Sequence, residues 1–300
     1  MQFTFLGTAG SWPTKERSTA AIVVATEPEL LLFDCGEGTQ RQFFQSTMSF
    51  MRVRRVFISH FHGDHFLGLP GLIQSMCLNG RHEPLDLYGP DGAEEMFQRA
   101  LHLGTYTLRF PVAIHTVAPE TTIEQPGYTV RAARADHPVP ALAFRLEEAP
   151  KRGRFDAERA RALGIHGRDF SRLEAGERVH VDGRIVEPSD VMGPPRPGRS
   201  FVYSGDTAPS EDVRRLARGA TVLVHEATTA ADLEAEANRW GHSSARQAAT
   251  IARDAEAVAL LLNHFSSRYK DIEPLEAEAR TVFPATTAAR DLDHRLIRQP

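Results

Sequence analysis

The feature that most constrains this chain is the six-residue stretch His-Phe-His-Gly-Asp-His at 60–65, which gathers three imidazoles and one carboxylate. The preceding run Val-Phe-Ile-Ser at 56–59 predicts a buried strand, and Gly63 is typical of a turn. The stretch is therefore expected at a strand end that opens into a loop. A polar loop with scattered histidines is the alternative, but this spacing after an apolar strand is rare by chance.

The spacing within this stretch favours a pair of metal ions. Side chains two positions apart on extended backbone share a face, so His60 and His62 can bind one ion. Asp64 and His65 follow the bend and can face a second ion. Mixed imidazole and carboxylate ligands indicate Zn²⁺, with Mn²⁺, Co²⁺ or Fe²⁺ as alternatives.

The composition is that of a globular protein. The chain has 300 residues, of which 41% are hydrophobic and 25% charged, enough to form one large or two small domains. A net charge of -4 argues against a surface coated with positive charge for nucleic acid, although a local basic element is permitted. We expect neither a signal peptide nor a membrane span at the N-terminus. Two cysteines, Cys35 and Cys77, do not suggest a disulfide framework, so the cytoplasm is the expected location.

Short apolar runs alternate with helical patterns along most of the chain. Strands are predicted at 2–6, 20–25, 29–34, 53–59, 85–88, 111–117, 128–134, 141–147, 200–204, 221–225 and 257–263, with a weaker one near 285–297. Helices are predicted at 69–78, 92–103, 210–218, 243–255 and 273–282. This order favours two packed mixed sheets with helices on both outer faces. Residues 149–198 are rich in proline and glycine and have little apolar periodicity, so they are expected to form an inserted arm.

Two metal ions need more ligands than the first stretch supplies, and three further strand ends offer them. His137 follows the strand predicted at 128–134, Asp206 follows Phe-Val-Tyr-Ser-Gly, and His264 follows an apolar run. Carboxyl ends of strands are where sheet proteins place site residues. Singly, each has another interpretation: His137 could shape a turn before a proline, and Asp206 could cap a helix.

The constellation resembles the metallo-β-lactamase superfamily and, more narrowly, its ribonuclease Z branch, the tRNA 3′-processing endonucleases. The motifs that carry the resemblance are FLGTAGSWPT at 5–14, LFDCGEGTQRQ at 32–42, ISHFHGDHFLGLPGL at 58–72, DHPVPALAFR at 136–145, YSGDTAP at 203–209, VHEATT at 224–229, GHSSARQAA at 241–249 and NHFSSRY at 263–269. The resemblance implies an αβ/βα four-layer sandwich, the metallo-β-lactamase fold, over residues 1–300 as one catalytic domain with a projecting arm at 149–198.

The resemblance also implies a set of ligands for two Zn²⁺ ions. The first ion would be held by His60, His62 and His137. The second would be held by Asp64, His65 and His264. Asp206 would bridge the two ions, and the family assigns Asp64 the role of base as well as ligand.

Two further residues have implied roles in the reaction. His242 would protonate the departing ribose 3′-oxygen, and Glu226 would orient or charge its imidazole. Alternatively, His242 supports a helix cap, since Ser243 is placed to cap the helix that begins near Ala245. Asp34 is expected to brace the metal loop.

Substrate binding is expected from two regions. Ser266 and Arg268 lie beside His264 and could receive a nucleotide, although a turn is the simpler interpretation. The window 151–172 has seven basic and three acidic residues, beginning with Lys151, Arg152 and Arg154. In the family such an arm grips tRNA, which suits phosphate contacts remote from the cut. The alternative is a solvated charged helix.

Together these features predict a zinc-dependent endoribonuclease that removes the 3′ trailer from precursor tRNA after the discriminator base and leaves a 3′-hydroxyl. The family's short forms are homodimers, so a cytoplasmic homodimer with precursor tRNA as partner and no membrane is expected. Two alternatives remain: a small-molecule phosphodiesterase or lactonase of the same superfamily, and a tRNA-binding protein without catalysis.

Overall fold

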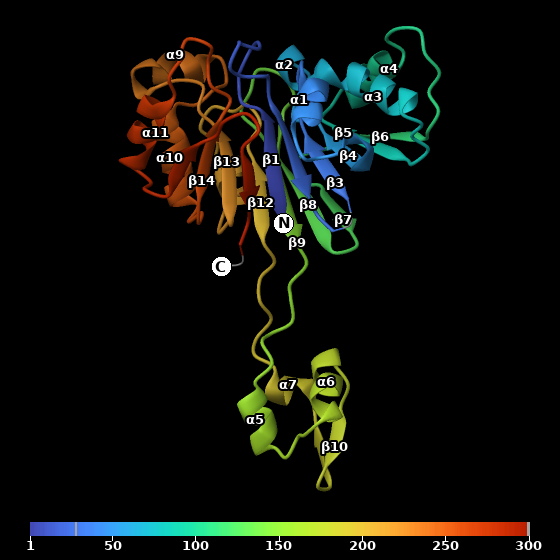
Figure 1. Cartoon of the computed structure of the whole chain (residues 1–300). Coiled ribbons are helices and arrows are strands. Elements are labelled where there is room, and N and C mark those ends of the chain that lie inside the picture. The colour runs from blue at the N-terminus through green and yellow to red at the C-terminus, as the bar shows by residue number, and fades with distance from the viewer. Residues whose placement is uncertain (28, 299–300) are drawn as a thin grey trace. The chain divides into compact units, whose positions relative to one another are not determined.

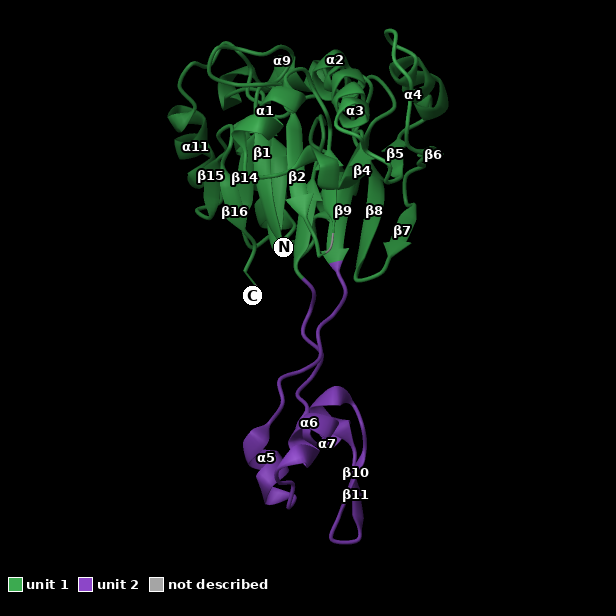
Figure 2. Cartoon of the chain, turned by 45° about the vertical axis from the view of Figure 1, so that its right-hand side comes forward, with its two compact units in different colours: residues 1–147, 199–300 green, residues 148–198 purple. Residues whose placement is uncertain are grey.

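The computed structural model describes residues 1–27 and 29–298. The chain divides into two compact units (Figure 2): unit 1 comprises Met1–Glu147 with Arg199–Pro300, and unit 2 comprises Glu148–Gly198. Unit 2 therefore begins and ends within one residue of the insertion expected from the sequence. Among the described residues, no helix is both long and apolar enough to cross a membrane.

Two seven-stranded sheets form the centre of unit 1 (Figure 1). In spatial order, the first contains β16 (His294–Leu296), β1 (Gln2–Gly7), β2 (Ala21–Ala25), β3 (Leu30–Phe33), β4 (Val53–Phe57), β5 (Leu85–Gly89) and β6 (Val112–Thr116). The second contains β15 (Thr286–Ala288), β14 (Leu260–Asn263), β13 (Val222–Glu226), β12 (Ser200–Tyr203), β9 (Leu142–Glu148), β8 (Tyr128–Arg134) and β7 (Thr122–Gln125). Each sheet mixes antiparallel and parallel pairs, as β1–β2 and β3–β4 illustrate in the first and β9–β12 and β12–β13 in the second, which confirms the predicted sheet type.

Helices cover the outer face of each sheet. Those of the first half are α1 (Thr39–Gln45), η1 (Phe50–Arg52), α2 (Gly63–Phe66), α3 (Gly68–Leu78) and α4 (Ala93–Leu101). Those of the second half are α8 (Glu211–Leu216), η2 (Ala231–Leu233), α9 (Glu234–Arg239), α10 (Ala245–Asp254) and α11 (Glu273–Arg280). The result is the four-layer αβ/βα sandwich that the sequence predicts.

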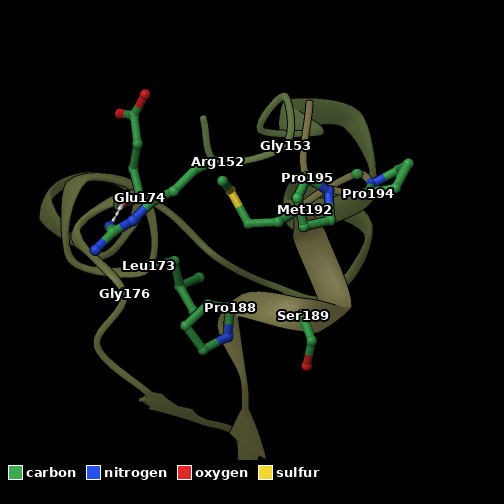
Figure 3. A pocket seen from close by; sticks show the side chains of 11 residues that line it. Arg152, Gly153, Leu173, Glu174, Gly176, Pro188, Ser189, Met192, Pro194 and Pro195 are labelled. Atoms are coloured by element: carbon green, nitrogen blue, oxygen red, sulfur yellow. Dashed lines mark hydrogen bonds between the residues drawn. The ribbon is translucent and has the colours of Figure 1, made fainter. Parts of the chain in front are cut away.

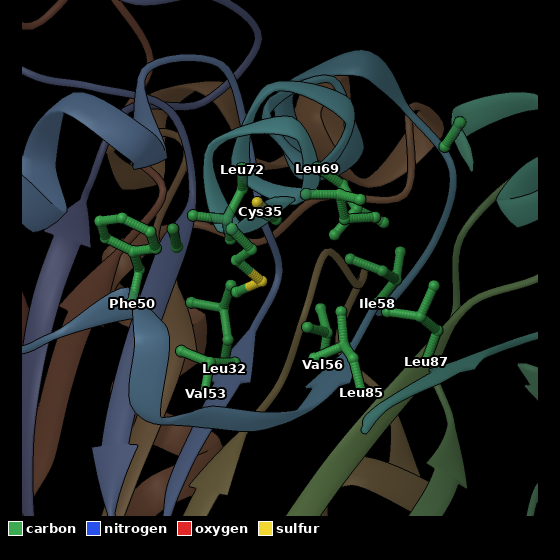
Figure 4. Packing of buried hydrophobic residues seen from close by; sticks show 14 of the residues in the cluster. Leu32, Cys35, Phe50, Val53, Val56, Ile58, Leu69, Leu72, Leu85 and Leu87 are labelled. Atoms are coloured by element: carbon green, nitrogen blue, oxygen red, sulfur yellow. The ribbon is translucent and has the colours of Figure 1, made fainter. Parts of the chain in front are cut away.

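Side chains that alternate along a single strand contribute to the apolar layers on both faces of its sheet, and three such layers are filled in this way. In β3, Leu30 and Leu32 pack beneath α3, whereas Leu31 and Phe33 pack into the core between the sheets. Because successive strand side chains point to opposite faces, a continuous apolar run is what a strand buried on both sides requires. Figure 4 shows the outer layer, where Leu32 lies near Leu72 of α3.

The structure corrects one predicted cap and refines the C-terminal strands. The N-cap of α10 is Ser244, in a capping box with Gln247, and not Ser243. The Ser243 hydroxyl instead donates to the carbonyl of Thr207 at 2.7 Å. The weak strand expected near 285–297 is two short strands, β15 and β16, which join different sheets.

Unit 2 contains α5 (Ala157–Ala162), α6 (Arg168–Ala175), the hairpin β10 (Val179–Val181) and β11 (Arg184–Val186), and α7 (Pro188–Val191). It has its own small core, which the weak apolar periodicity of the sequence did not predict. Its fully buried side chains are Ala160, Ile165, Leu173, Val179, Val186 and Val191. Each short element supplies only one of these residues, and Ile165 lies between α5 and α6, so no helical or strand period is long enough to detect.

A cavity of about 450 Å³ lies within unit 2 (Figure 3). Leu173, Met192 and Pro188 form its apolar wall, and the Arg152 guanidinium donates to the Glu174 carbonyl at 2.8 Å beside it. Arg152 is thus already hydrogen-bonded to the C-terminal turn of α6.

Candidate metal centre

The seven predicted ligands come from both sheets and lie together at one end of unit 1. His60 and His62 follow β4, Asp64 and His65 lie in α2, His137 follows β8, Asp206 follows β12 and His264 follows β14. Their donor atoms form two groups that could each hold a metal ion: one of His60, His62 and His137, and one of Asp64, His65, Asp206 and His264. The expectation that separate strand ends converge here is confirmed.

In the first group the three imidazole nitrogens lie close together. His62 Nδ1 lies 3.1 Å from His60 Nε2 and 3.2 Å from His137 Nε2. His60 is fully buried, whereas His62 and His137 are at least partly open to solvent. One side of this group is therefore accessible to a substrate.

The second group is more buried. His65 Nε2 lies 3.2 Å from His264 Nε2, and both nitrogens lie 3.3 Å from Asp206 Oδ1. Asp64 Oδ2 approaches the same nitrogens at 3.5 and 3.2 Å. A single ion in this space would have two imidazoles and two carboxylates as ligands.

The Asp206 carboxylate faces both groups. While Oδ1 points into the second group, Oδ2 lies 3.7 Å from His60 Nε2 of the first. Oδ1 is buried and accepts no hydrogen bond from any described residue. An uncompensated oxygen of this kind is costly unless it binds a cation.

The spacing of the donor atoms fits metal ligation. Four ligands at the usual Zn–N or Zn–O length of about 2.0–2.1 Å stand about 3.3–3.4 Å apart at the corners of a tetrahedron. The separations given above within each group are 3.1–3.5 Å, and all donor atoms of each group lie within 4.8 Å of one another. Since the contacting imidazole nitrogens have no proton acceptor other than one another and the carboxylates, the residues present fit a pair of ions.

The electrostatics of the site also favour cations. Burial, the largest influence on Asp206, opposes its charge, but His264 and His65 outweigh it and hold the Asp206 pKa well below its ordinary value. Burial likewise favours the neutral form of His65, yet the surrounding carboxylates, Asp206 first, raise its pKa well above the ordinary value. Asp64, Asp206 and Asp34 therefore place several negative charges in a space with little solvent. Metal ions can replace the protons that otherwise balance them.

The ligands are held from behind by hydrogen bonds to their second ring nitrogens. His65 Nδ1 donates to Asp34 Oδ2 at 2.6 Å, and His137 Nδ1 donates to the Gly241 carbonyl at 2.9 Å. His264 Nδ1 lies 3.0 Å from the Thr228 hydroxyl. Such partners fix the tautomer and the ring orientation that a metal requires.

Asp34 ties the metal loop to the second sheet. Its carboxylate accepts hydrogen bonds from the backbone and hydroxyl of Ser59 at 2.6 and 2.7 Å, and from the Tyr203 hydroxyl at 2.7 Å. Asp34 and His264 both have positive φ angles, 56° and 61°, which non-glycine residues seldom adopt. Strain of this kind persists where the surroundings over-determine the backbone, as they do here.

His242 and Glu226 form a pair beside the two groups. His242 Nδ1 lies 3.0 Å from Glu226 Oε1, and the fully buried Glu226 carboxylate also accepts from the Thr207 amide at 2.8 Å and the Thr228 hydroxyl at 2.6 Å. Burial opposes the charged form of His242, but the Glu226 carboxylate outweighs it and raises the His242 pKa to about 9. The imidazole is thus oriented and charged, which suits a proton donor.

His242 also lies close enough to the ligands to suggest a second interpretation. With His137 and Asp206 it forms another group of three donor atoms, and its ring stacks against His264 with centroids 5.5 Å apart. The geometry therefore permits His242 to be either a metal ligand or a proton donor.

Sequence reasoning assigned no role to the residues that follow β1. The Ser11 amide donates to Asp64 Oδ2 at 2.6 Å, and the Gly10 amide donates to the Phe265 carbonyl at 3.0 Å. A Cβ on Gly10 would lie only 2.6 Å from the His264 ring. The motif at 5–14, FLGTAGSWPT, contained a signal for this loop. A glycine in such a motif often marks a place where the backbone comes close to another part of the protein. Thr228 was likewise missed as the hydroxyl that links Glu226 to His264.

The predicted substrate contacts fall into two places. Ser266 and the exposed Arg268 lie in a turn after His264, where the Ser266 carbonyl accepts from the Tyr269 amide at 3.0 Å. The predicted turn is present, and a contact with a nucleotide stays a prediction. Lys151, Arg152 and Arg154 lie in unit 2. Unit 2 contains ten basic and nine acidic side chains, so its positive excess is confined to its first half.

Comparisons with known proteins agree with this geometry. The profile described as beta-lactamase superfamily domain matches residues 183–265, and that described as anti-Pycsar protein Apyc1 matches residues 1–138. Human tRNase Z, short form, has a similar structure, with a TM-score of 0.72 at 28% identity over 99% of this chain and 100% of that one. Fold and site together define a protein of the metallo-β-lactamase superfamily.

The narrower family follows from the curated relatives. The chain is 47% identical to a ribonuclease Z of Methanothermobacter thermautotrophicus, over 97% of this chain and 95% of that protein. It is 43% identical to a ribonuclease Z of Methanosarcina acetivorans, over 97% and 96% respectively. The chain belongs to the ribonuclease Z family.

Replacing Asp206 by alanine tests whether it bridges the two groups. Each ion would lose a ligand and the repulsion between the ions would be unscreened, so we expect both to be lost together. Elemental analysis of the purified variant should give less than one metal ion per chain, whereas the exposed Asp232→Ala control should match the wild type. Two ions per chain in Asp206→Ala would exclude the bridging role.

Proposed function

We propose that this chain is a zinc-dependent endoribonuclease that removes the 3′ trailer from precursor tRNA by hydrolysing the phosphodiester after the discriminator base. The observation that carries the proposal is the pair of ligand groups, with Asp206 in the second group facing His60 of the first at 3.7 Å and the His242–Glu226 pair beside them. Membership of the ribonuclease Z family supports tRNA as the substrate.

The distances between the donor atoms support the ligand assignment. His60, His62 and His137 would hold one zinc ion, Asp64, His65 and His264 the other, and Asp206 both. Such a pair, when bound, supplies a nucleophile at neutral pH and stabilises charge on the attacking and leaving oxygens of an in-line displacement. The remaining roles belong to the protein's own side chains.

Asp64 is suited to accept the proton of the attacking water. Its Oδ2 is fixed by the Ser11 amide and faces His264. No described residue donates a hydrogen bond to Oδ1, so that oxygen is free to take a proton while Oδ2 remains a ligand.

His242 is suited to donate a proton to the departing 3′-oxygen. Glu226 holds Nδ1, which leaves Nε2 as the atom that carries the transferable proton. The Thr207 amide and the Thr228 hydroxyl keep the Glu226 carboxylate in place. Glu226 therefore positions the acid without touching substrate.

The direct test is cleavage of a precursor tRNA that has a 3′ trailer. The wild-type protein should release the trailer with a 5′-phosphate and leave a 3′-hydroxyl after the discriminator base. Under the same conditions a lactone should not be hydrolysed at a comparable rate. Hydrolysis of small esters with no action on the precursor would instead support a small-molecule hydrolase, and binding of the precursor without cleavage would support an inactive tRNA-binding protein.

His242→Ala separates an acid from a ligand. As an acid, His242 is not needed to hold metal, so the variant should keep its metal content while turnover of precursor tRNA falls by about 10²–10⁴-fold. A nitrophenyl phosphodiester should lose much less activity, because its good leaving group needs no protonation. His102→Ala, an exposed histidine at the end of α4, is the matched control. Metal loss, or equal rate losses on both substrates, would refute the acid role.

The pH dependence of turnover tests the part played by Glu226. A general acid must be protonated, so activity falls as the pH rises through its pKa. Since the Glu226 carboxylate raises the pKa of His242, Glu226→Gln should lower it and move the alkaline limb of the kcat profile to lower pH. An alkaline limb that stayed in place in this variant would show that the charge of Glu226 does not govern the acid.

We propose that unit 2 binds tRNA phosphates. Among the described residues, Lys151, Arg154 and Arg168 form no ion pair, whereas Arg172 pairs with Asp169 and Glu177. The unpaired cations are the ones free to contact a backbone phosphate.

Unit 2 can be removed without cutting a strand. Glu147 of β9 pairs with Ser200 of β12, so Glu148 and Arg199 can be joined by a two-residue Asn-Gly turn. This deletion should weaken binding of precursor tRNA, and each lost phosphate contact should lower the slope of log affinity against log salt by about 0.7–0.9. Hydrolysis of a nitrophenyl phosphodiester should survive, because no proposed ligand lies in unit 2. Unchanged affinity and slope would make unit 2 a solvated surface feature.

The resemblance further predicts a cytoplasmic homodimer. Light scattering on the purified protein should give twice the 33.3 kDa mass of one chain.

A further inference from the structure

We propose that the two tryptophans of this chain, Trp12 and Trp240, are stacking platforms for the unpaired bases on either side of the bond that is cut. The inference rests on the proposed endoribonuclease function and names the residues that position its substrate. Trp240 would take the base retained on the tRNA, the discriminator, and Trp12 the first base of the trailer.

Both tryptophans are mostly exposed, at 60% for Trp12 and 68% for Trp240. Tryptophan usually buries most of its large apolar surface, and an isolated exposed apolar residue is not unusual by itself. What distinguishes these two is their position, since each adjoins a residue that contacts a predicted metal ligand.

Trp12 follows the residue that contacts the second group. The Ser11 amide donates to Asp64 Oδ2 at 2.6 Å, and Gly10 approaches the His264 ring so closely that a Cβ would not fit. The Trp12 amide donates to the Gly10 carbonyl at 2.9 Å, which fixes the backbone of this loop.

Trp240 precedes the residue that contacts the first group. The Gly241 carbonyl accepts from His137 Nδ1 at 2.9 Å, and a Cβ on Gly241 would lie 2.7 Å from that nitrogen. The amides of Trp240 and His242 both donate to the Ala237 carbonyl at 3.0 Å. The two tryptophans are therefore anchored to different halves of the metal centre. Trp12 lies in the β1–β2 loop and Trp240 directly follows α9, and Figure 1 places that loop and α9 at the same end of unit 1.

Each tryptophan also has a cation close by in sequence. Arg239 precedes Trp240, Lys15 follows Trp12 by three positions, and both side chains are exposed. An aromatic platform beside a positive charge is the usual way to bind single-stranded nucleic acid, because the ring stacks on a base and the cation contacts its phosphate. Unpaired bases at an RNA end are the form in which RNA offers its base faces.

The position of His242 determines which base each tryptophan is proposed to bind. The proposed acid protonates the 3′-oxygen of the retained nucleoside, and Trp240 is two residues from it. The base of that nucleoside is thus the nearest to Trp240. Trp12, on the side of Asp64 and His264, is left to take the base beyond the cut.

Abasic substrates test both assignments in a double-mutant cycle. On an ordinary precursor, Trp240→Leu and Trp12→Leu should each lower kcat/KM by about tenfold, within the range measured for loss of one base stack. On a precursor abasic at the discriminator, Trp240→Leu should cause no further loss while Trp12→Leu still does. On a precursor abasic at the first trailer position, the pattern should reverse. Phenylalanine at either position should restore most of the activity, and Leu78→Ala, an 87% exposed residue at the end of α3, is the matched control.

Losses that are the same on all three substrates would overturn stacking while leaving the endonuclease intact. A wild-type protein that does not cleave the ordinary precursor would instead overturn the proposed function, and the inference with it.

Fluorescence of the holoenzyme gives a readout independent of activity, since each single variant retains one tryptophan. In Trp12→Leu, titration with tRNA that ends at the discriminator should quench Trp240, and the same RNA with an abasic 3′ end should not. In Trp240→Leu, neither RNA should quench Trp12, because both lack the trailer. Quenching of Trp12 but not Trp240 would reverse the polarity, and quenching of neither would exclude the platforms.

Discussion

Burial of the Asp206 carboxylate between two groups of imidazoles is the interaction on which the rest of the site depends. A buried carboxylate is stable only if positive charge is near, and one of its oxygens has no hydrogen-bond donor among the described residues. The protein's own groups balance this charge by raising the pKa of His65. Two cations would balance it better, because they use the lone pairs of both Asp206 oxygens at once.

The fold meets this requirement by bringing strand ends from two sheets to one place. The first sheet provides the loop after β4, and the second provides the residues that follow β8, β12 and β14. Asp34 joins the two sheets, because its carboxylate accepts from Ser59 on one side and from Tyr203 on the other. Behind it, the rings of Phe33 and Phe57 stack with centroids 5.2 Å apart in the core between the sheets. Packing of that core therefore sets the spacing of the ligands.

Local patterns predicted the strands of the two large sheets except β7, the four-layer architecture and the ligand candidates of 60–65, because each depends on a short stretch of chain. The ligands outside 60–65 were harder to predict. That His137 and His264 belong to different groups depends on which strand ends become neighbours, which no local period specifies, and the prediction came from resemblance. The Ser11 amide was missed for the same reason, since it reaches Asp64 from 53 residues away.

The mistaken cap shows how tertiary contacts decide between neighbours. Ser243 and Ser244 are both acceptable caps for α10 by type, but Ser243 is taken by the Thr207 carbonyl next to Asp206, and Ser244 is left to cap. In unit 2 the elements are too short for periodicity, and six apolar residues form a core that becomes visible only in three dimensions.

The most direct test of the shared carboxylate is the metal dependence of cleavage by the wild-type protein. After chelation and removal of the chelator, precursor tRNA cleavage should be absent and should return as zinc is added, reaching its maximum at two ions per chain. Full activity in the chelated protein, or a maximum at one ion per chain, would contradict a centre in which Asp206 holds two ions.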